Sequence, residues 1–212
     1  ETADMRYQEE FGRPIADHGI TLVPGDCVYV DLNADGEINS NDATRDIGYT
    51  DMPEYTAGLN TGFTWKNFDF SMQWTGAWNV DRMLSEFRRP LGDTNEKGLL
   101  LYQYDTTWRS SADTFTAKYP RASSLHASNN YAGSDLYLIN ASYLRLKNVE
   151  IGYNFKFPFM KKLKMDNCRL YVNGYNLLTI TGFKWGDPES RQSDRPNYPL
   201  TRVFNIGLKL GF

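Results

Sequence analysis

The sequence predicts an all-β fold built from antiparallel strands, and two observations lead to this prediction. Aromatic residues make up 15% of the 212-residue chain and glycine occurs 17 times, a composition that suits strands and turns better than helices. Apolar and polar residues also alternate strictly in several segments, which is the period of a strand with two different faces. No stretch of 18 apolar residues is present, so no transmembrane helix is predicted. The 23 basic and 26 acidic residues leave a net charge of −3, which argues against a nucleic-acid partner.

Five segments carry the alternation, and the connections between them are short and long in turn. The predicted strands are 55–65, 68–78, 141–156, 168–180 and 201–212. The short connections are 66–67 and 157–167, and the long ones are 79–140 and 181–199. The first two strands, separated by two residues, predict a β-hairpin. Within the first long connection, residues 99–104 fit a short helix or a short strand equally well.

Two architectures produce such two-faced strands. A soluble β-sandwich turns the apolar faces inward, whereas a transmembrane barrel turns them toward lipid and its polar faces toward the lumen. Aromatic residues at the strand ends, such as Trp65, Trp78 and Phe155, suit the girdles of a barrel. The polar faces are rich in glycine and poor in charge, and the alternation of short and long connections is also typical of outer-membrane barrels. The pattern therefore favours a barrel. Five strands cannot close one, so we expect the chain to be a C-terminal fragment.

Residues 1–54 are expected to form an extracellular loop region before the strands, with 1–26 as loop and a short strand at 27–30. Within it, residues 31–42 have the spacing of a calcium loop, with oxygen-bearing side chains at positions 1, 3, 5, 9 and 12 and Gly36 at position 6. The predicted ligands are Asp31, Asn33, Asp35, Glu37, Asn39 and Asp42, with Glu37 acting through its carbonyl. The last position holds Asp instead of the usual Glu, and a solvated Asx-rich turn is the alternative.

Several motifs resemble, in order along the chain, the SusC/RagA-like TonB-dependent outer-membrane transporters. They are Gly25-Asp26-Cys27-Val28-Tyr29-Val30-Asp31, Tyr119-Pro120-Arg121, Ala141-Ser142-Tyr143-Leu144-Arg145, Tyr171-Val172-Asn173-Gly174, Asp187-Pro188-Glu189, Tyr198-Pro199 and Phe204-Asn205-Ile206-Gly207. The stretch after Trp108 departs from the family pattern.

The resemblance implies the last strands of a plugged, 22-stranded barrel in the outer membrane of a Gram-negative bacterium, with loops at the cell surface. It further implies an importer of glycans or oligopeptides that works with a SusD-like lipoprotein and an inner-membrane TonB complex, the latter contacted by a missing N-terminal part. The alternative is a soluble calcium-binding β-domain with a dockerin-like loop, used in adhesion or carbohydrate-binding scaffolding.

No enzyme is predicted. His18 and His126 have no partner at metal-ligand spacing and are expected to be incidental surface positions. Four aromatic residues in the predicted outer loops are candidates for stacking on substrate or packing on the lipoprotein, although plain loop packing fits them equally well. These residues are Trp108, Tyr131, Trp185 and Tyr198.

Overall fold

The structure is a computed structural model that describes residues 3–84, 101–113, 116–158, 164–190 and 200–212. The chain divides into two compact units. Unit 1 consists of Glu1–Gly48 and Met83–Leu138, and unit 2 of Tyr49–Arg82 and Ile139–Phe212. This division differs from the predicted boundary after residue 54, because most of the long connection between the second and third predicted strands packs with the N-terminal segment.

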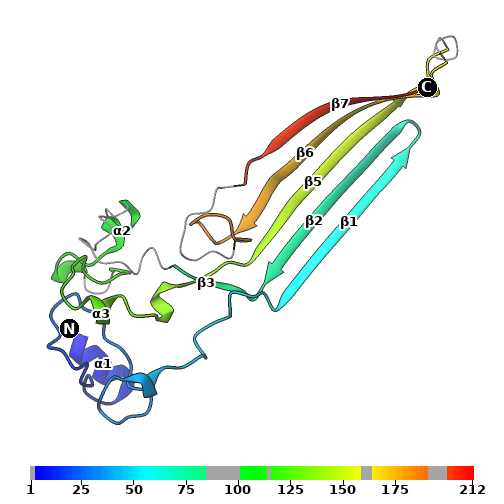
Figure 1. Ribbon diagram of the computed structural model, residues 1–212. Helices are drawn as coiled ribbons and strands as arrows, with labels where there is room; N and C mark the ends of the chain where they lie inside the picture. Colours follow the sequence, from blue (N-terminus) through cyan, green and yellow to red (C-terminus); the bar gives the residue numbers. More distant parts are fainter. Residues whose placement is uncertain (1–2, 85–100, 114–115, 159–163, 191–199) are drawn as a thin grey trace. The chain divides into compact units, whose positions relative to one another are not determined.

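Unit 2 is dominated by a five-stranded antiparallel sheet in the order β1-β2-β5-β6-β7 (Figure 1). Its strands are β1 (Tyr55–Trp65), β2 (Phe68–Trp78), β5 (Tyr143–Phe155), β6 (Asn167–Thr181) and β7 (Val203–Gly211). The first two have the predicted bounds, and the others agree with the predicted ranges to within two residues. Among the described residues, β1 and β7 each have a strand on one side only, so the sheet is open.

The register places polar residues on one face and apolar residues on the other. Asn60 lies opposite Gln73, which lies opposite Asn148, while Phe63 lies opposite Phe70 and Phe70 opposite Ile151. A bulge between Leu146 and Asn148 shifts the alternation by one residue along β5. As a result, the side chains of Arg145 and Asn148 lie on the same polar face. In a regular strand these two positions would face opposite sides.

Unit 1 is built from short elements. They are α1 (Ala3–Phe11), α2 (Leu101–Thr106), α3 (Ala127–Asn130) and single 3₁₀ turns at Ser40–Asp42, Ser111–Asp113 and Asp135–Tyr137. A two-stranded ladder pairs β3 (Asp81–Met83) with β4 (Leu138–Asn140) where the chain changes unit. No helix in the described ranges is long and apolar enough to cross a membrane.

Two predictions for the N-terminal region were wrong. Residues expected to be loop form α1, in which Tyr7 and Phe11 lie one turn apart with ring centroids separated by 4.8 Å. Residues 27–30 form no strand in the described chain. Their backbone is instead bound by side chains: the Cys27 amide donates to Asn130 Oδ1 and the Tyr29 amide to His18 Nε2. In the first long connection, α2 shows that the described part of 99–104 is helical.

Candidate functional site

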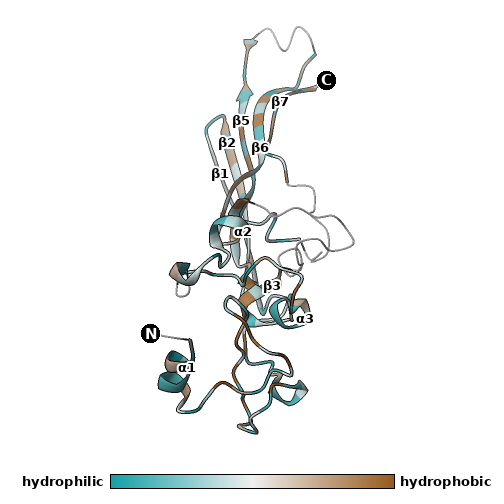
Figure 2. Ribbon diagram, turned by 90° about the vertical axis from the view of Figure 1, so that its left-hand side faces the viewer, coloured by the Kyte–Doolittle hydropathy of each residue, from teal (hydrophilic) through white to brown (hydrophobic). Residues whose placement is uncertain are grey.

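The apolar face of the sheet carries many exposed large side chains. Phe204 is 70% exposed and Ile206 79% exposed. The exposed apolar residues on this face are Tyr55, Leu59, Phe63, Trp65, Phe68, Trp78, Ile151, Leu170, Val172, Leu178, Ile180, Phe204, Ile206, Leu208 and Leu210. Hydrophilic and hydrophobic colours alternate along the strands in Figure 2. A continuous apolar surface of this kind marks a contact with lipid or with another apolar surface.

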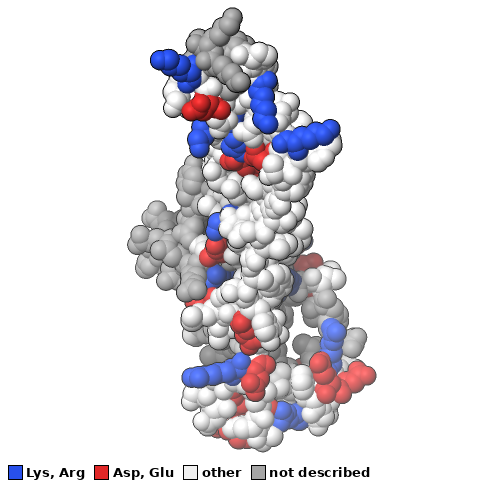
Figure 3. Space-filling view, turned by 90° about the vertical axis from the view of Figure 1, so that its right-hand side faces the viewer, with Lys and Arg blue, Asp and Glu red and all other residues white. Residues whose placement is uncertain are grey.

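The polar face carries a charged cluster near the β1–β2 turn. Arg169 pairs with Asp69 and, through Nη2 at 2.8 Å, with Oε1 of Glu150. Gly152 makes this possible, because a Cβ at that position would overlap the Arg169 guanidinium. Figure 3 shows charged side chains gathered toward this end of the sheet and a mostly uncharged strand surface beyond them.

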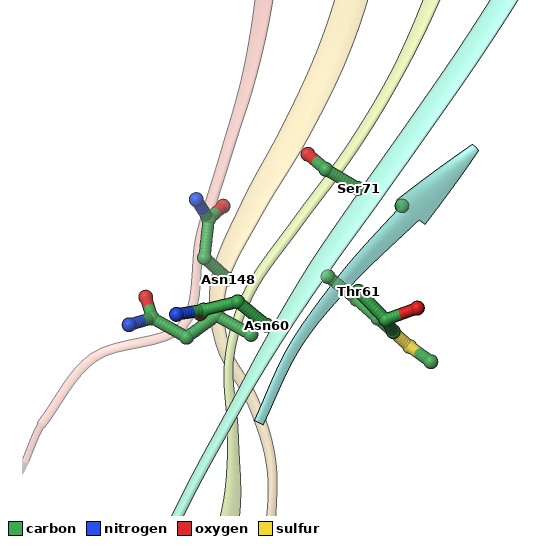
Figure 4. A pocket seen from close by; sticks show the side chains of 7 residues that line it. Asn60, Thr61, Ser71 and Asn148 are labelled. Carbon is green, nitrogen blue, oxygen red and sulfur yellow. The ribbon is translucent and has the colours of Figure 1, made fainter. Parts of the chain in front are cut away.

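The middle of the polar face is uncharged and hollowed. Three amide side chains, Asn60, Gln73 and Asn148, lie side by side across β1, β2 and β5, and we call them the amide row. Beside it lies a cavity of about 400 Å³ lined by the amide row and by Thr61, Gly62, Ser71 and Met72 (Figure 4).

At the far end of the polar face, a buried arginine fixes a loop. Arg145 is 2% exposed; its guanidinium donates to Asp187 at 2.6 Å, Glu189 at 2.8 Å and Thr179 Oγ1 at 3.1 Å. The segment around Asp187 therefore lies against the polar face of β5 and β6, and not against the apolar face. Cavities of about 370 and 350 Å³ adjoin this segment and share Pro188 as a lining residue.

The predicted calcium loop is held by its own hydrogen bonds. Asp31 is buried, and its two carboxylate oxygens accept the amides of Ala34 at 2.6 Å and Gly36 at 2.9 Å. Asn33 and Asp35 each accept the amide two residues further on, at 3.0 and 2.9 Å. Gly36 takes the left-handed conformation that the sharp turn needs, with φ at +89°.

The last two predicted ligands close the loop from the other side. Asp42 accepts the amides of Leu32 at 2.8 Å and Asn39 at 2.9 Å, and the Asn39 amide is the chief cause of the lowered pKa of Asp42. Within the described residues, no three His, Cys, Asp or Glu side chains come together as a metal-binding group. The donor chemistry and the turn suit calcium, while the carboxylate oxygens are engaged by backbone amides.

A buried carboxylate organises the rest of unit 1. Asp26 accepts bonds from Arg121 Nε at 2.8 Å, His126 Nδ1 at 2.7 Å, Asn130 Nδ2 at 2.8 Å and the amide of Val23 at 3.0 Å. Burial by itself raises the pKa of Asp26, but these four hydrogen bonds outweigh it and lower the pKa to about 2. The three side-chain bonds join residue 26 to residues about 100 positions later, and so hold unit 1 together.

An aromatic cluster packs beside this carboxylate. Tyr137 is fully buried, its ring stacks on those of Tyr119 and Tyr131 at centroid distances of 5.8 and 6.5 Å, and its hydroxyl donates to the Asn130 carbonyl. Burial is also the main reason why the pKa of the neighbouring Cys27 thiol is raised to about 12. This cysteine is therefore a structural residue and not a reactive one.

The four aromatic candidates do not form one site in the described structure. Trp108 packs against Gly25, where a Cβ would overlap its ring, and Tyr131 belongs to the stack just described. Trp185 is half-buried in unit 2, while Tyr198 lies outside the described residues. Trp108 and Tyr131 therefore have packing roles within unit 1.

Sequence reasoning missed the residues that the structure brings together most tightly. His126 was expected to be incidental, but its side chain is only 18% exposed and is bound to Asp26. Arg121 and Arg145 belong to motifs that the sequence singled out, yet their partners lie 95 and 42 residues away. The available signal was the charge of Arg145 within an alternating strand.

No family model matches the chain. The chain is 30% identical over 206 residues to a TonB-dependent receptor of Formosa agariphila. The alignment covers 89% of this chain and 19% of that protein. It is 28% identical over 210 residues to the TonB-dependent receptor SusC of Bacteroides thetaiotaomicron, covering 98% of this chain and 19% of the relative. The chain thus spans about a fifth of the length of these curated relatives.

Solved structures of the RagAB peptide importer share the fold. The 'closed-closed' state matches with a TM-score of 0.60 and 24% identity, over 90% of this chain and 21% of the matched chain. A structure of the RagAB peptide transporter matches with a TM-score of 0.58 and 21% identity, over 77% of this chain and 18% of the matched chain.

Proposed function

We propose that this chain, which belongs to the SusC/RagA-like TonB-dependent receptors, forms part of the wall of an import channel in the outer membrane of a Gram-negative bacterium. The observation that carries the proposal is the reversed polarity of the sheet, with large apolar side chains outside and amides and paired charges on the other face. In a barrel, the first face meets lipid and the second lines the lumen. The relatives are receptors and transporters, which supports transport and not catalysis.

The backbone of the sheet suits this role. Adjacent strands pair over nearly their whole length, so the peptide groups of the three inner strands are satisfied without water. Lipid tolerates strands only under this condition, and the edges of β1 and β7 must then pair with further strands of a closed barrel. We infer that the rest of the protein supplies those strands.

Partner and substrate follow from the relatives alone and are part of the proposal. We propose a SusD-like surface lipoprotein as the partner and a TonB complex as the source of energy, with a glycan or an oligopeptide as the imported nutrient. RagAB is described as a peptide transporter, and SusC as a TonB-dependent receptor.

Cell fractionation and uptake measurements on the full-length protein test the proposal. We expect the protein in the outer-membrane fraction. We also expect deletion of its gene to abolish uptake of one class of oligomer, and uptake to stop when the TonB complex is removed. Recovery of the protein in a soluble fraction without detergent would contradict the proposal and favour the alternative of a soluble calcium-binding β-domain.

We propose in addition that residues 31–42 bind calcium as a structural clamp, with Asp31, Asn33, Asp35, Glu37, Asn39 and Asp42 as ligands. The Asx-type bonds and the Gly36 turn support this proposal. Isothermal titration of the full-length protein should detect calcium binding, and Asp31→Asn with Asp35→Asn should abolish it. The matched control is Asp46→Asn, an exposed carboxylate outside the loop. Absence of binding at millimolar calcium would contradict the proposed calcium clamp.

A further inference from the structure

The loop at residues 31–42 concentrates negative charge and has no basic residue of its own. It contains four acidic residues and neither Lys nor Arg. Asp31, the first of the four, is buried, so water screens its charge poorly. Backbone amides bind the carboxylates of Asp31 and Asp42, but an amide carries no net charge and leaves the repulsion between the carboxylates in place. A cation held beside the loop would offset that repulsion.

Arg13 supplies such a cation from outside the loop. Its Nη2 donates to the carbonyl oxygen of Asp31, and its Nη1 lies 4.0 Å from Oδ2 of the same residue. The guanidinium also acts on the other end of the loop. The pKa of Asp42 lies below its ordinary value chiefly because of the Asn39 amide, and in part because of the positive charge of Arg13. Arg13 therefore stabilises carboxylates at both the first and the last position of the loop.

The segment that carries Arg13 is fixed to the loop on both sides of this residue. Before it, the Tyr7 hydroxyl in α1 accepts the amide of Asp31 at 3.3 Å. After it, Asp17 forms a parallel bridge with Glu37, through backbone hydrogen bonds of 2.8 and 2.7 Å to the residues that flank Glu37. These contacts hold the guanidinium beside the loop, so its charge is a fixed part of the loop's surroundings.

A fixed cation has opposite effects on the loop with and without calcium. Without calcium, it offsets the repulsion among the carboxylates and stabilises the folded loop. With calcium, it places a like charge beside the bound ion, which lowers the affinity, since calcium affinity depends on the charge around the site. A residue that only held the Asp31 backbone in place would act differently, because its loss would loosen the loop and weaken calcium binding.

We propose that Arg13 is the resident counter-cation of the 31–42 loop: it keeps the loop folded without calcium and lowers the affinity of the loop for calcium. The second part rests on the proposed calcium clamp, whereas the first concerns the calcium-free loop alone. Calcium then tightens a loop that is already folded, instead of folding it.

Hydrogen exchange of the amides of residues 31–42 in the full-length protein in detergent tests the proposal. It is measured first with a chelator and then as calcium is added. With the chelator, Arg13→Gln should accelerate exchange in the loop. In the titration, Arg13→Gln should raise the calcium affinity about tenfold, because a like charge beside the ion is removed. Arg13→Lys keeps the charge and should keep the wild-type affinity.

The matched control is Arg45→Gln, which removes the same charge from an exposed position three residues after Asp42 and should change neither result. Unchanged exchange in the sheet of unit 2 shows that each variant is folded. Four outcomes would overturn the role of Arg13: equal effects of Arg13→Gln and Arg45→Gln, unchanged exchange of Arg13→Gln with the chelator, a calcium affinity of Arg13→Gln no higher than that of the wild type, or an affinity raised equally by Arg13→Lys.

Failure of the calcium clamp gives a different result. In that case neither the wild type nor Arg13→Gln responds to calcium, and the proposed calcium site is wrong together with the effect of Arg13 on its affinity. Exchange with the chelator then decides by itself whether Arg13 is the counter-cation of the loop.

Discussion

Unit 1 and the sheet of unit 2 distribute polar and apolar residues in opposite ways. In unit 1 the most buried side chains are Tyr137, Asn130 and Asp31, and polar groups are locked inside by hydrogen bonds. In the sheet, large apolar side chains are exposed, as Ile206 shows at 79%. The comparison shows that unit 1 has the polar and apolar distribution of a protein surrounded by water. The sheet, by contrast, requires an apolar environment on one of its faces.

The largest effect is expected from removing the central carboxylate of unit 1. Asp26→Ala leaves Arg121 and the Asn130 amide buried without their partner, which costs about 3–5 kcal/mol for a buried pair. Hydrogen exchange of the full-length protein should show faster exchange throughout unit 1 and unchanged exchange in the sheet. Asp46→Ala, at an exposed carboxylate, serves as the control. An equal loss of protection from hydrogen exchange in both units would show that Asp26 does not stabilise unit 1 separately from the sheet.

The next effect is expected from a charge on the apolar face. Ile206→Lys should cost about 2–4 kcal/mol in the free energy of unfolding from liposomes if residue 206 lies near the middle of the bilayer. Asn205→Lys, one residue away on the polar face, should cost only about 1 kcal/mol, for its lost hydrogen bond to Asn173. Similar losses of unfolding free energy for the two variants would contradict the difference in polarity between the two faces.

Acid should weaken unit 1 through the carboxylate of Asp26. The pKa of Asp26 falls from 3.8 to about 2 on folding, so its ionised form stabilises unit 1 at any pH above about 4. That stability, about 2 kcal/mol for such a shift, is lost as the pH falls from about 4 to about 2. Hydrogen exchange measured over this range should show unit 1 opening, and Asp26→Asn should remove most of the pH dependence of that opening.

A smaller effect is expected at Arg145, where a buried ion pair in unit 2 holds a loop, as the pair of Asp26 and Arg121 does in unit 1. Lysine cannot bond to Asp187 and Glu189 in the forked geometry of a guanidinium, so Arg145→Lys should cost about 1–2 kcal/mol. We expect faster proteolysis of the segment around Asp187 in the variant. The double variant Asp187→Asn with Glu189→Gln should show the same sensitivity. A loop as resistant as the wild type would show that Arg145 does not hold it.

Local patterns predicted the sheet well, but they did not predict unit 1. The alternation in 55–65 and 68–78 determines both the strands and their faces, because a shift of one residue would invert every side chain. Unit 1 depends instead on contacts such as Asp26 with Arg121, 95 residues apart, which no local period encodes. The helix α1 was missed for a related reason, since only two of its residues, Tyr7 and Phe11, form its apolar contact.

The candidate site was predictable in part. The motifs containing Arg145 and Asp187 were recognised separately, and only the fold shows that they bind each other. The amide row was hidden because its three members come from different strands and depend on register. A bulge at Lys147, which no sequence pattern indicated, determines which residues of β5 lie on the polar face.

Lipid accessibility along β7 tests the reversed polarity of the sheet most directly. Spin labels would be placed one at a time on cysteines at residues 204–209 of the full-length protein, with Cys27 and Cys168 replaced by serine, and the protein reconstituted in liposomes. We predict that oxygen in the lipid reaches labels at Phe204, Ile206 and Leu208, and that a water-soluble relaxant reaches those at Asn205, Gly207 and Lys209. Labels with uniform accessibility, or with the reverse alternation, would contradict the account.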